Sequence, residues 1–450
     1  MPDSVIRAQP PLEFIPPNLQ PGLVKSFGKA IPWVAEHRNG IVGVETLHIE
    51  TLVELYRQFQ AKETRFIIAF RHPSTVDPLS LFYLLAQSLP KAAAQTGIAI
   101  ESPCHAYFLY DRGVPLWAGS LVGWLLPRAG GISIQRGRLD RQSLKTARDK
   151  FANGEQPMMV APEGATNGLS ELVSPLEPGV AQMAFWCLDD LRAAGRDEKV
   201  VVLPLGLKYE YLTPPWEGVD RLLTDMEADC GLPVLQGERY ERLLRIGNYL
   251  LEVLESYYER FYRHETTQAG DISERLRNLL ESGLKTSEEY FGIQAKGSLT
   301  DRCRRIEGAG WDRIYREDLK DKPLTPLQRG LADRAAEEAD RRMWHMRIVE
   351  NFVAVTGKYV QENPTADRFA ETVSLLSKTV SRLKGIDVIS PPSLGKRRAK
   401  ITIGIPILVN DLYPAYLENK QGARKSVSEL TQRLQHDLEV LTNGTASGST

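Results

Sequence analysis

Short apolar runs separated by helical patterns fill the first half of the chain. Residues 65–70 (RFIIAF) form a typical run, in which two β-branched residues lie between aromatic ones. Loop signals follow these runs, and helical spacing begins after several of the loops. Further runs of this kind cover residues 42–49, 106–109, 132–134, 158–161 and 200–209. Strands that alternate with helices predict an α/β fold.

The second half of the chain carries helical patterns over most of its length. Leucines and aromatic residues recur on one face between residues 240 and 261. Residues 216–394 are therefore predicted to be all-helical. Three helix-start signals divide this block: Asp271 with Glu274, Thr325-Pro326, and Asn363-Pro364.

The composition is typical of a globular protein without a strong electrostatic field. Hydrophobic residues make up 42% and charged residues 25%, and the net charge over 450 residues is −1. This balance excludes a global attraction to nucleic acid. The four cysteines are widely spaced and share no metal or redox motif, so we expect reduced thiols in a cytoplasmic protein, with no metal and no cofactor.

The segment Gly113–Pro127 comes nearest to a membrane span. It is uncharged between Arg112 and Arg128, but it is shorter than the roughly 18 residues that a span requires. Its tryptophans, Trp117 and Trp124, fit either a buried core helix or an apolar surface in contact with lipid. We favour the core helix.

His72 and Asp77 are the first candidate catalytic residues. They lie in the loop after the strand 65–70, where α/β enzymes often place their chemistry. Histidine is the commonest general base near neutral pH, and an aspartate on its other ring nitrogen stabilises the imidazolium. A structural role is the alternative to a catalytic one, because Asp77 directly before Pro78 also fits a helix N-cap.

Two later loops carry candidate ligand-binding residues. A glycine pair that ends at Gly131 precedes a short strand, and this strand delivers Arg136, whose planar fork suits a phosphate. The next apolar run leads into Glu163 and Gly164. A carboxylate and a glycine at a strand end can bind a hydroxyl or order nearby amides. The alternative interpretation is that Arg136 is an ordinary surface arginine that follows a strand.

Taken in order, these features resemble the four motifs of the glycerolipid acyltransferases, the family of 1-acylglycerol-3-phosphate and glycerol-3-phosphate acyltransferases. The resemblance implies a mixed sheet flanked by helices, with His72 and Asp77 catalytic and with Gly131, Arg136, Glu163 and Gly164 binding substrate. The motifs correspond to His72-x4-Asp77, Gly131 to Arg136, Pro162-Glu163-Gly164, and Val202-Leu203-Pro204.

The third motif departs from the family pattern. The family usually has Glu-Gly-Thr-Arg-Ser, whereas this chain continues from Glu163-Gly164 with Ala165-Thr166-Asn167. The arginine that helps to hold the acceptor phosphate is therefore missing. The resemblance implies transfer of a fatty acyl group to 1-acylglycerol-3-phosphate in phospholipid synthesis, with glycerol-3-phosphate, a lysophospholipid or another alcohol as alternative acceptors.

The implied donor is a thioester of coenzyme A or of acyl carrier protein. No serine or cysteine occupies a comparable nucleophile position, so we expect direct attack by the acceptor hydroxyl. Backbone amides near Gly130-Gly131 or after Pro73 are candidate donors to the oxyanion. A non-catalytic, membrane-associated scaffold is an alternative from another class, but intact His72 and Asp77 argue against it.

The end of the chain resembles the end of the family's catalytic domain. A strand at residues 399–409 contains Gly404-Ile405-Pro406, and a final helix covers residues 427–441. We therefore expect the helical block to be a large insertion, although a C-terminal helical domain followed by an unrelated hairpin also fits. The predicted division is an N-terminal arm and amphipathic helix (1–40), the main acyltransferase part (41–215), the insertion (216–394), the closing strand and helix (395–442), and a disordered tail (443–450).

Lipid substrates require access to a membrane, so we expect peripheral association with a membrane surface. Residues 1–20 read as a flexible arm, and residues 22–36 as a weak amphipathic helix interrupted by Pro32. This helix and the segment 113–127 are two candidate contacts. The third is a basic cluster of Lys396, Arg397, Arg398 and Lys400.

Overall fold

The computed structural model describes residues 6–443, apart from residues 136, 138, 139, 235, 236, 265–269, 321–323, 354, 356 and 387–392. The chain divides into two compact units. The sheet unit comprises Phe14–Ile134, Arg141–Pro215 and Ser393–Thr450. The helical unit comprises Met1–Glu13, Gln135–Asp140 and Trp216–Pro392.

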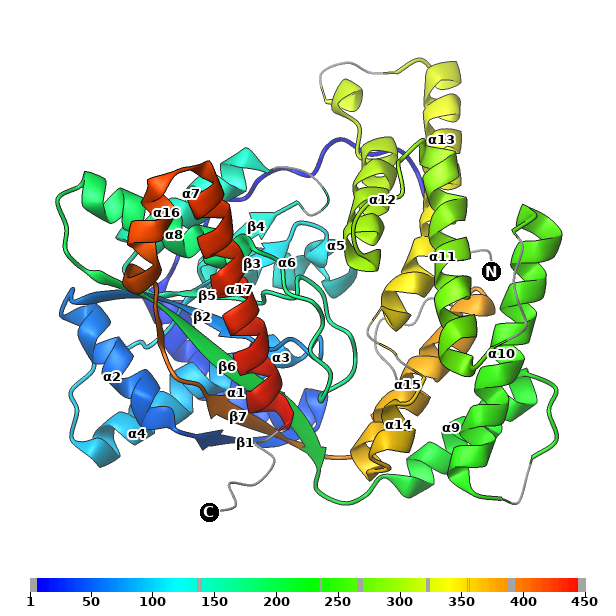
Figure 1. Cartoon of the computed structure of the whole chain (residues 1–450), viewed down its shortest axis with the longest axis horizontal. Coiled ribbons are helices and arrows are strands. Elements are labelled where there is room, and N and C mark those ends of the chain that lie inside the picture. Colours follow the sequence, from blue (N-terminus) through cyan, green and yellow to red (C-terminus); the bar gives the residue numbers. More distant parts are fainter. Residues whose placement is uncertain are drawn as a thin grey trace. The chain divides into compact units, whose positions relative to one another are not determined.

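An eight-stranded mixed sheet forms the centre of the sheet unit (Figure 1). The strand order is β1-β7-β6-β2-β5-β3-β4, and β8 pairs with β6. Strands β6, β2, β5, β3 and β4 run parallel, whereas β7 is antiparallel to β6 and parallel to β1. This arrangement confirms the predicted mixed α/β sheet. The strands are β1 (Ile41–Leu47), β2 (Thr64–Phe70), β3 (Tyr107–Asp111), β4 (Gly131–Ile134), β5 (Met158–Val160), β6 (Lys199–Tyr211), β7 (Arg397–Ile403) and β8 (Ile407–Leu408).

Helices cover both faces of this sheet. Successive side chains of β2 point to opposite faces, and each face carries apolar residues that must be buried. Phe66, Ile68 and Phe70 belong to one apolar core, while Ile67 and Ala69 belong to another. Because the strand is buried on both faces, its residues from Phe66 to Phe70 are all apolar, as its sequence suggested. The first core is closed by α1 (Pro21–Asn39), α2 (Ile49–Gln60), α3 (Asp77–Tyr83), the π-helical turn η1 (Leu84–Ser88) and α4 (Leu89–Thr96), and the second by α7 (Arg141–Asn153), α8 (Gly179–Ala193), η3 (Val409–Leu412), α16 (Tyr413–Glu418) and α17 (Lys420–Asn443).

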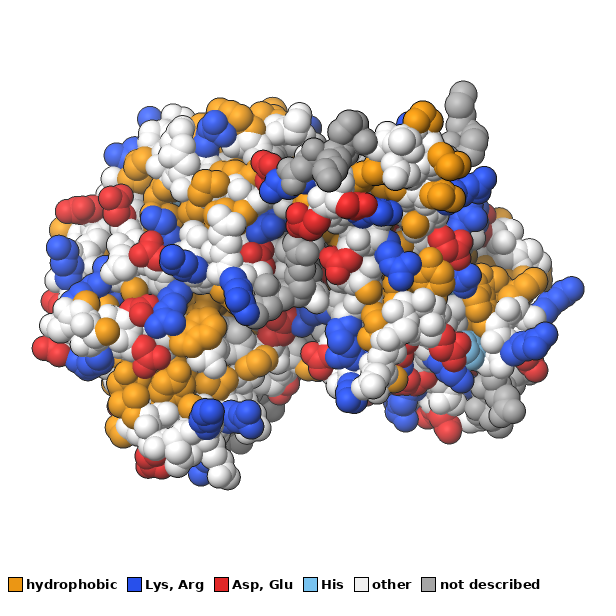
Figure 2. Space-filling model, turned by 90° about the horizontal axis from the view of Figure 1, so that it is seen from above, with side chains coloured by type: hydrophobic (Ala, Val, Ile, Leu, Met, Phe, Trp, Pro, Cys, Tyr) orange, Lys and Arg blue, Asp and Glu red, His pale blue; other side chains and the backbone are white. Residues whose placement is uncertain are grey.

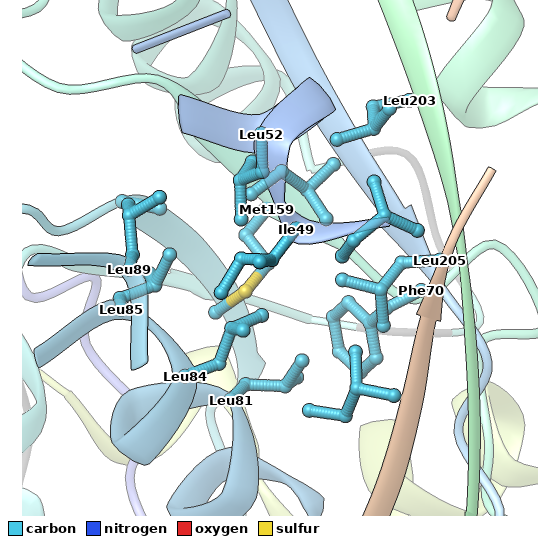
Figure 3. Close-up of a cluster of buried hydrophobic side chains, with 14 of the residues drawn as sticks. Ile49, Leu52, Phe70, Leu81, Leu84, Leu85, Leu89, Met159, Leu203 and Leu205 are labelled. Atoms are coloured by element: carbon cyan, nitrogen blue, oxygen red, sulfur yellow. The ribbon is translucent and has the colours of Figure 1, made fainter. Parts of the chain in front are cut away.

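The first core fixes α3 against the sheet. Leu81 of α3 and Leu84 of η1 are fully buried and lie with Phe70, Leu203 and Leu205 in one cluster (Figure 3). Apolar burial of this kind stabilises the fold by about 1.5–3 kcal/mol per large side chain. The packing sets the position of the first turn of α3 relative to the end of β2.

Pro204 lies inside β6, not at an edge of the sheet. On one side residues 199–205 of β6 pair with β2, with Pro204 opposite Ala69. On the other side it pairs with β7 from Leu205 onward and with β8 at Val201 and Val202. Pro204 therefore occupies the break between two partner strands, where its missing N–H is tolerated.

The helical unit packs around a core of its own. Asp271 and Thr325 cap α11 and α13 as the sequence predicts, since each side chain accepts a backbone N–H three residues later. Ser298 and Asp301 form a further capping box at α12. The helices are α9 (Trp216–Asp229), α10 (Arg239–Tyr262), α11 (Ile272–Phe291), α12 (Leu299–Ile314), the short 3-10 turn η2 (Glu317–Leu319), α13 (Pro326–Phe352), α14 (Tyr359–Glu362) and α15 (Ala366–Leu383).

Hydrogen bonds hold the N-terminal segment from Ala8 onward, so the expectation of a flexible arm is wrong there. The N–H groups of Asn18 and Gln20 donate to the carbonyl oxygens of Pro127 and Arg128 at 2.8 and 2.9 Å. In α1, Pro32 is accommodated within the helix, which buries one face. Its members are Val24, Gly28, Ile31 and Ala35.

The expectation of a core helix at residues 113–127 is also wrong. The segment folds into two short helices, α5 (Val114–Ala118) and α6 (Ser120–Arg128), which meet at Gly119 with φ 92°. They pack on each other so closely that a Cβ on Gly123 would lie 2.8 Å from Cβ of Pro115. Because each helix is short, this contact leaves much of their apolar surface in solvent. Four large side chains are exposed: Leu116, Trp117, Leu121 and Trp124.

Among the described residues, no helix has both the length and the apolar character needed to cross a bilayer. On the face in Figure 2, acidic and basic side chains are interspersed with apolar ones, as the net charge of −1 suggests.

Candidate functional site

His72 and Asp77 lie side by side at the end of β2. His72 follows the strand by two residues, and Asp77 is the first residue of α3. Nδ1 of His72 is 2.8 Å from Oδ2 of Asp77. The Asp77 side chain is fully buried, whereas that of His72 is 22% exposed. Within the described residues, no polar group bonds to Nε2 of His72, so this nitrogen is available to a substrate.

Asp77 accepts two further hydrogen bonds. The N–H of Ser74 donates to Oδ2 at 2.9 Å, and the hydroxyl of Tyr209 donates to Oδ1 at 2.6 Å. Burial and the neighbouring Asp77 carboxylate raise the pKa of Tyr209 well above its ordinary value, so the phenol stays neutral and acts as a donor. Three donors keep the Asp77 carboxylate in one orientation. Tyr209 was not recognised as a site residue from the sequence. The available signal was a tyrosine, which carries a polar hydroxyl, at a buried position of β6.

Glu163 is buried behind the His72 loop. Nη1 of Arg71 donates to Oε1 and Oε2 of Glu163 at 2.7 and 2.9 Å. Neither side chain has exposed surface. The N–H of His72 donates to Oε1 at 2.8 Å, and the N–H of Ser174 donates to Oε2 at 2.8 Å. The carboxylate therefore orients the backbone of the candidate base. Its predicted role in substrate binding stays a prediction.

Arg71 and Asn167 tie the loop after β5 to the loop after β2. Nη2 of Arg71 donates to Oδ1 of Asn167 at 3.0 Å, to the carbonyl of Leu169 at 2.6 Å, and to the carbonyl of Leu172. The N–H of Gly168 donates to the carbonyl of Pro73 at 3.1 Å. Neither Arg71 nor Asn167 was recognised from the sequence. An arginine directly after a buried strand was the only local signal.

Two of the predicted glycines have clear backbone or packing reasons. Gly164 has φ 72°, a left-handed conformation that favours glycine, and it forms the turn after Glu163. A Cβ on Gly131 would lie 2.7 Å from the carbonyl oxygen of Leu126 and 3.0 Å from the ring of Phe108. Their predicted roles in substrate binding stay predictions. Arg136 lies outside the described residues.

The candidate oxyanion amides are already engaged. The N–H of Ser74 bonds to Asp77, and the N–H of Gly130 donates to the carbonyl of Pro127 at 3.1 Å. The four cysteines are free thiols, and all are buried. Burial raises the pKa of Cys104 to about 12, which makes this thiol a poor nucleophile. These facts are in keeping with attack by the acceptor itself.

Comparison with known families identifies one domain. Residues 50–208 match the family model described as Acyltransferase. The matched range contains His72, Asp77, Gly131, Glu163 and Pro204, and it ends one residue before Tyr209. No curated protein matches the chain.

Replacement of Arg71 by leucine should destabilise the sheet unit strongly. Arg71→Leu leaves Glu163 as a buried charge without its partner, and this should lower the free energy of unfolding by about 3–5 kcal/mol. Urea denaturation followed by near-ultraviolet circular dichroism measures the loss. The matched control is Arg398→Leu, since Arg398 forms an exposed ion pair with Glu45 at 3.4 Å. Its effect should stay within about 1 kcal/mol. Equal effects of the two changes would contradict the role of the buried pair.

Proposed function

From the premise that the chain carries an acyltransferase domain of the glycerolipid acyltransferase family in residues 50–208, we propose that it transfers a fatty acyl group from a thioester to 1-acylglycerol-3-phosphate. The observation that carries the proposal is the 2.8 Å pair of His72 with buried Asp77, with Nε2 of His72 open to substrate. The activity class, acyl transfer, follows from the domain. The acceptor and the residue roles are the proposal.

The geometry supports general-base catalysis. Nε2 of His72 takes the proton of the acceptor hydroxyl as its oxygen attacks the thioester carbonyl carbon. Asp77 holds the Nδ1–H tautomer and stabilises the imidazolium that forms. When the tetrahedral intermediate collapses, the carbon–sulfur bond breaks and the leaving thiolate takes the proton from His72. Coenzyme A and acyl carrier protein are both suitable carriers of this thioester.

The acceptor needs a cation for its phosphate, and the third motif does not provide one. Thr166 stands where the family usually has arginine, and Asn167 directs its side chain inward to Arg71. Arg71 has no exposed surface, so it is not available to a ligand. This leaves Arg136 as the proposed phosphate-binding residue. The altered third motif also leaves open a second candidate, an acyltransferase of the same family whose acceptor is glycerol-3-phosphate, a lysophospholipid or another alcohol.

We also propose that α5 and α6 hold the enzyme on a membrane surface. Their exposed side chains include Leu121 at 72% and Trp117 at 49%, and Arg128 packs its guanidinium 4.4 Å from the centre of the Trp124 ring. Apolar residues flanked by arginine suit the boundary between acyl chains and headgroups. Helix α6 leads directly into β4, so this surface lies next to the strand that precedes Arg136.

The basic cluster at residues 396–400 supports membrane binding less well. Lys396 pairs with Glu36 at 2.9 Å, Arg398 with Glu45 at 3.4 Å, and Lys400 with Glu210 at 3.8 Å. Each pair reduces the positive charge that this cluster would offer to anionic headgroups. The helices α5 and α6 are therefore the stronger candidate contact.

Loss of the base should abolish most of the turnover. His72→Ala should lower kcat by about a hundredfold or more, the range expected for removal of a general base, and Asp77→Asn should also lower it strongly. Steady-state assays with an acyl thioester and a panel of acceptors measure the effect, and circular dichroism checks the fold. Near-normal turnover of a folded His72→Ala protein would refute the proposed mechanism.

Arg136→Ala should raise the acceptor KM by about tenfold or more, because a hydrogen bond between charged groups is worth roughly 1.5–3 kcal/mol. The donor KM should change little. The matched control is Arg141→Ala, an exposed arginine at the start of α7. If the donor KM alone changes in Arg136→Ala, the arginine serves the thioester carrier and the assignment is wrong.

Polar substitution on α5 and α6 should release the enzyme from vesicles. The double variant Trp117→Ser, Leu121→Ser should weaken binding to anionic phospholipid vesicles by at least about tenfold, since each side chain contributes apolar burial in the interface. Flotation with liposomes measures binding. Leu417→Ser is the control, because Leu417 on α16 is 61% exposed and apolar. Unchanged flotation of the double variant would exclude this surface as the contact.

A further inference from the structure

A chain of buried hydrogen bonds runs behind the candidate base. It starts at Ser80, passes through the hydroxyl of Tyr209 and the carboxylate of Asp77, and ends at His72. The hydroxyl groups of Ser80 and Tyr209 are 3.0 Å apart, and Tyr209 to Asp77 is 2.6 Å. Ser80 and Asp77 have no exposed surface, and Tyr209 has 4%. The first three members are therefore sheltered from water.

The direction of each hydrogen bond follows from the donor inventory. An ionised carboxylate only accepts, so Tyr209 gives its single proton to Asp77. Tyr209 must then accept from Ser80, whose hydroxyl becomes the donor. Each donor polarises the next group, so the chain as a whole stabilises the negative charge on Asp77.

Tyr209 is held by elements that are far apart in the sequence. Its backbone N–H donates to Oγ of Ser170 at 3.4 Å, and the guanidinium of Arg397 lies 5.0 Å from the centre of its ring. Arg397 belongs to β7, the strand that follows the helical block. The position of Arg397 holds the phenol ring of Tyr209 in one orientation relative to α3.

We propose that Tyr209 is a positioning residue for acyl transfer, which acts through Asp77 to set the orientation and the basicity of His72. The inference rests on the proposed function, since it requires His72 to be the base. Tyr209 itself does not touch the reacting atoms. Its hydrogen bond partly neutralises Asp77, which keeps the carboxylate from holding the imidazolium proton too strongly.

Charged groups from several elements face this chain of hydrogen bonds. They are Asp77 from α3, Arg397 from β7, and the Arg71–Glu163 pair behind the backbone of His72. Arginine stays charged at all relevant pH values, and histidine is the side chain that ordinarily titrates between pH 5 and 8. The pH profile of the reaction is therefore the measurement that detects a change at the general base.

The test is the pH dependence of Tyr209→Phe with the acceptor that the unaltered enzyme uses best. At the plateau, kcat should fall by about tenfold, because Asp77 loses one of the three donors that fix its orientation, and His72 is then held less precisely. The acid limb of kcat/KM should move to higher pH by about half a unit or more, because Asp77 then stabilises the imidazolium more strongly. The KM values should change little.

Two companion variants separate positioning from structural support. Tyr56→Phe removes an equally buried hydroxyl that donates to the carbonyl of His105 at 2.7 Å in the same core, and its acid limb should not move. Ser80→Ala makes Tyr209 a weaker donor, so the acid limb should move in the same direction as in Tyr209→Phe, but less. If Tyr209→Phe does not fold, the shift in Ser80→Ala decides the question.

The outcomes distinguish this inference from the proposed function. If His72→Ala is inactive while Tyr209→Phe and Ser80→Ala both keep a normal acid limb, His72 remains the base and the role of Tyr209 is overturned. If folded His72→Ala remains active, the proposed function fails and this inference fails with it. A shift in Tyr209→Phe together with no shift in Tyr56→Phe supports the inference.

Discussion

The buried ion pair of Arg71 and Glu163 is the constraint on which the candidate site depends. Two opposite charges without any exposed surface are stable only when almost every donor and acceptor around them is satisfied. Here the partners come from the loop after β2 and the loop after β5, and only Nε of Arg71 lacks a partner among the described residues. The two loops therefore cannot move independently. Because Glu163 also accepts the N–H of His72, the same pair positions the candidate base.

The sheet was predictable because strands buried on both faces have a strong sequence signal. The runs at 65–70 and 200–209 correspond to β2 and β6, and their mostly apolar character follows from helices on both faces. The pairing of His72 with Asp77 was also predictable, since only four residues separate them. Helix starts at Asp271 and Thr325 were predicted correctly because a cap is a local interaction.

Interactions between distant residues were not predictable in this way. Tyr209 is 132 positions from Asp77, and Arg71 is 92 positions from Glu163. Nothing in the local pattern around either residue names its partner. The error at 113–127 has a different cause. Apolar composition alone does not distinguish a core helix from an exposed one, and the break at Gly119 produces two short helices that pack on each other.

The late return of β7 has a consequence for the order in which the fold is assembled. This strand fills the place between β1 and β6, yet the whole helical block separates it from β6 in the chain. While the protein is being synthesised, β1 and β6 each present an unpaired edge until the ribosome has passed residue 403. Unpaired edges are templates for pairing with other chains. The entropy of closing so long a connection grows only slowly with its length, so the finished fold tolerates the helical block between β6 and β7. The fold is therefore most exposed to pairing with other chains before β7 has been synthesised.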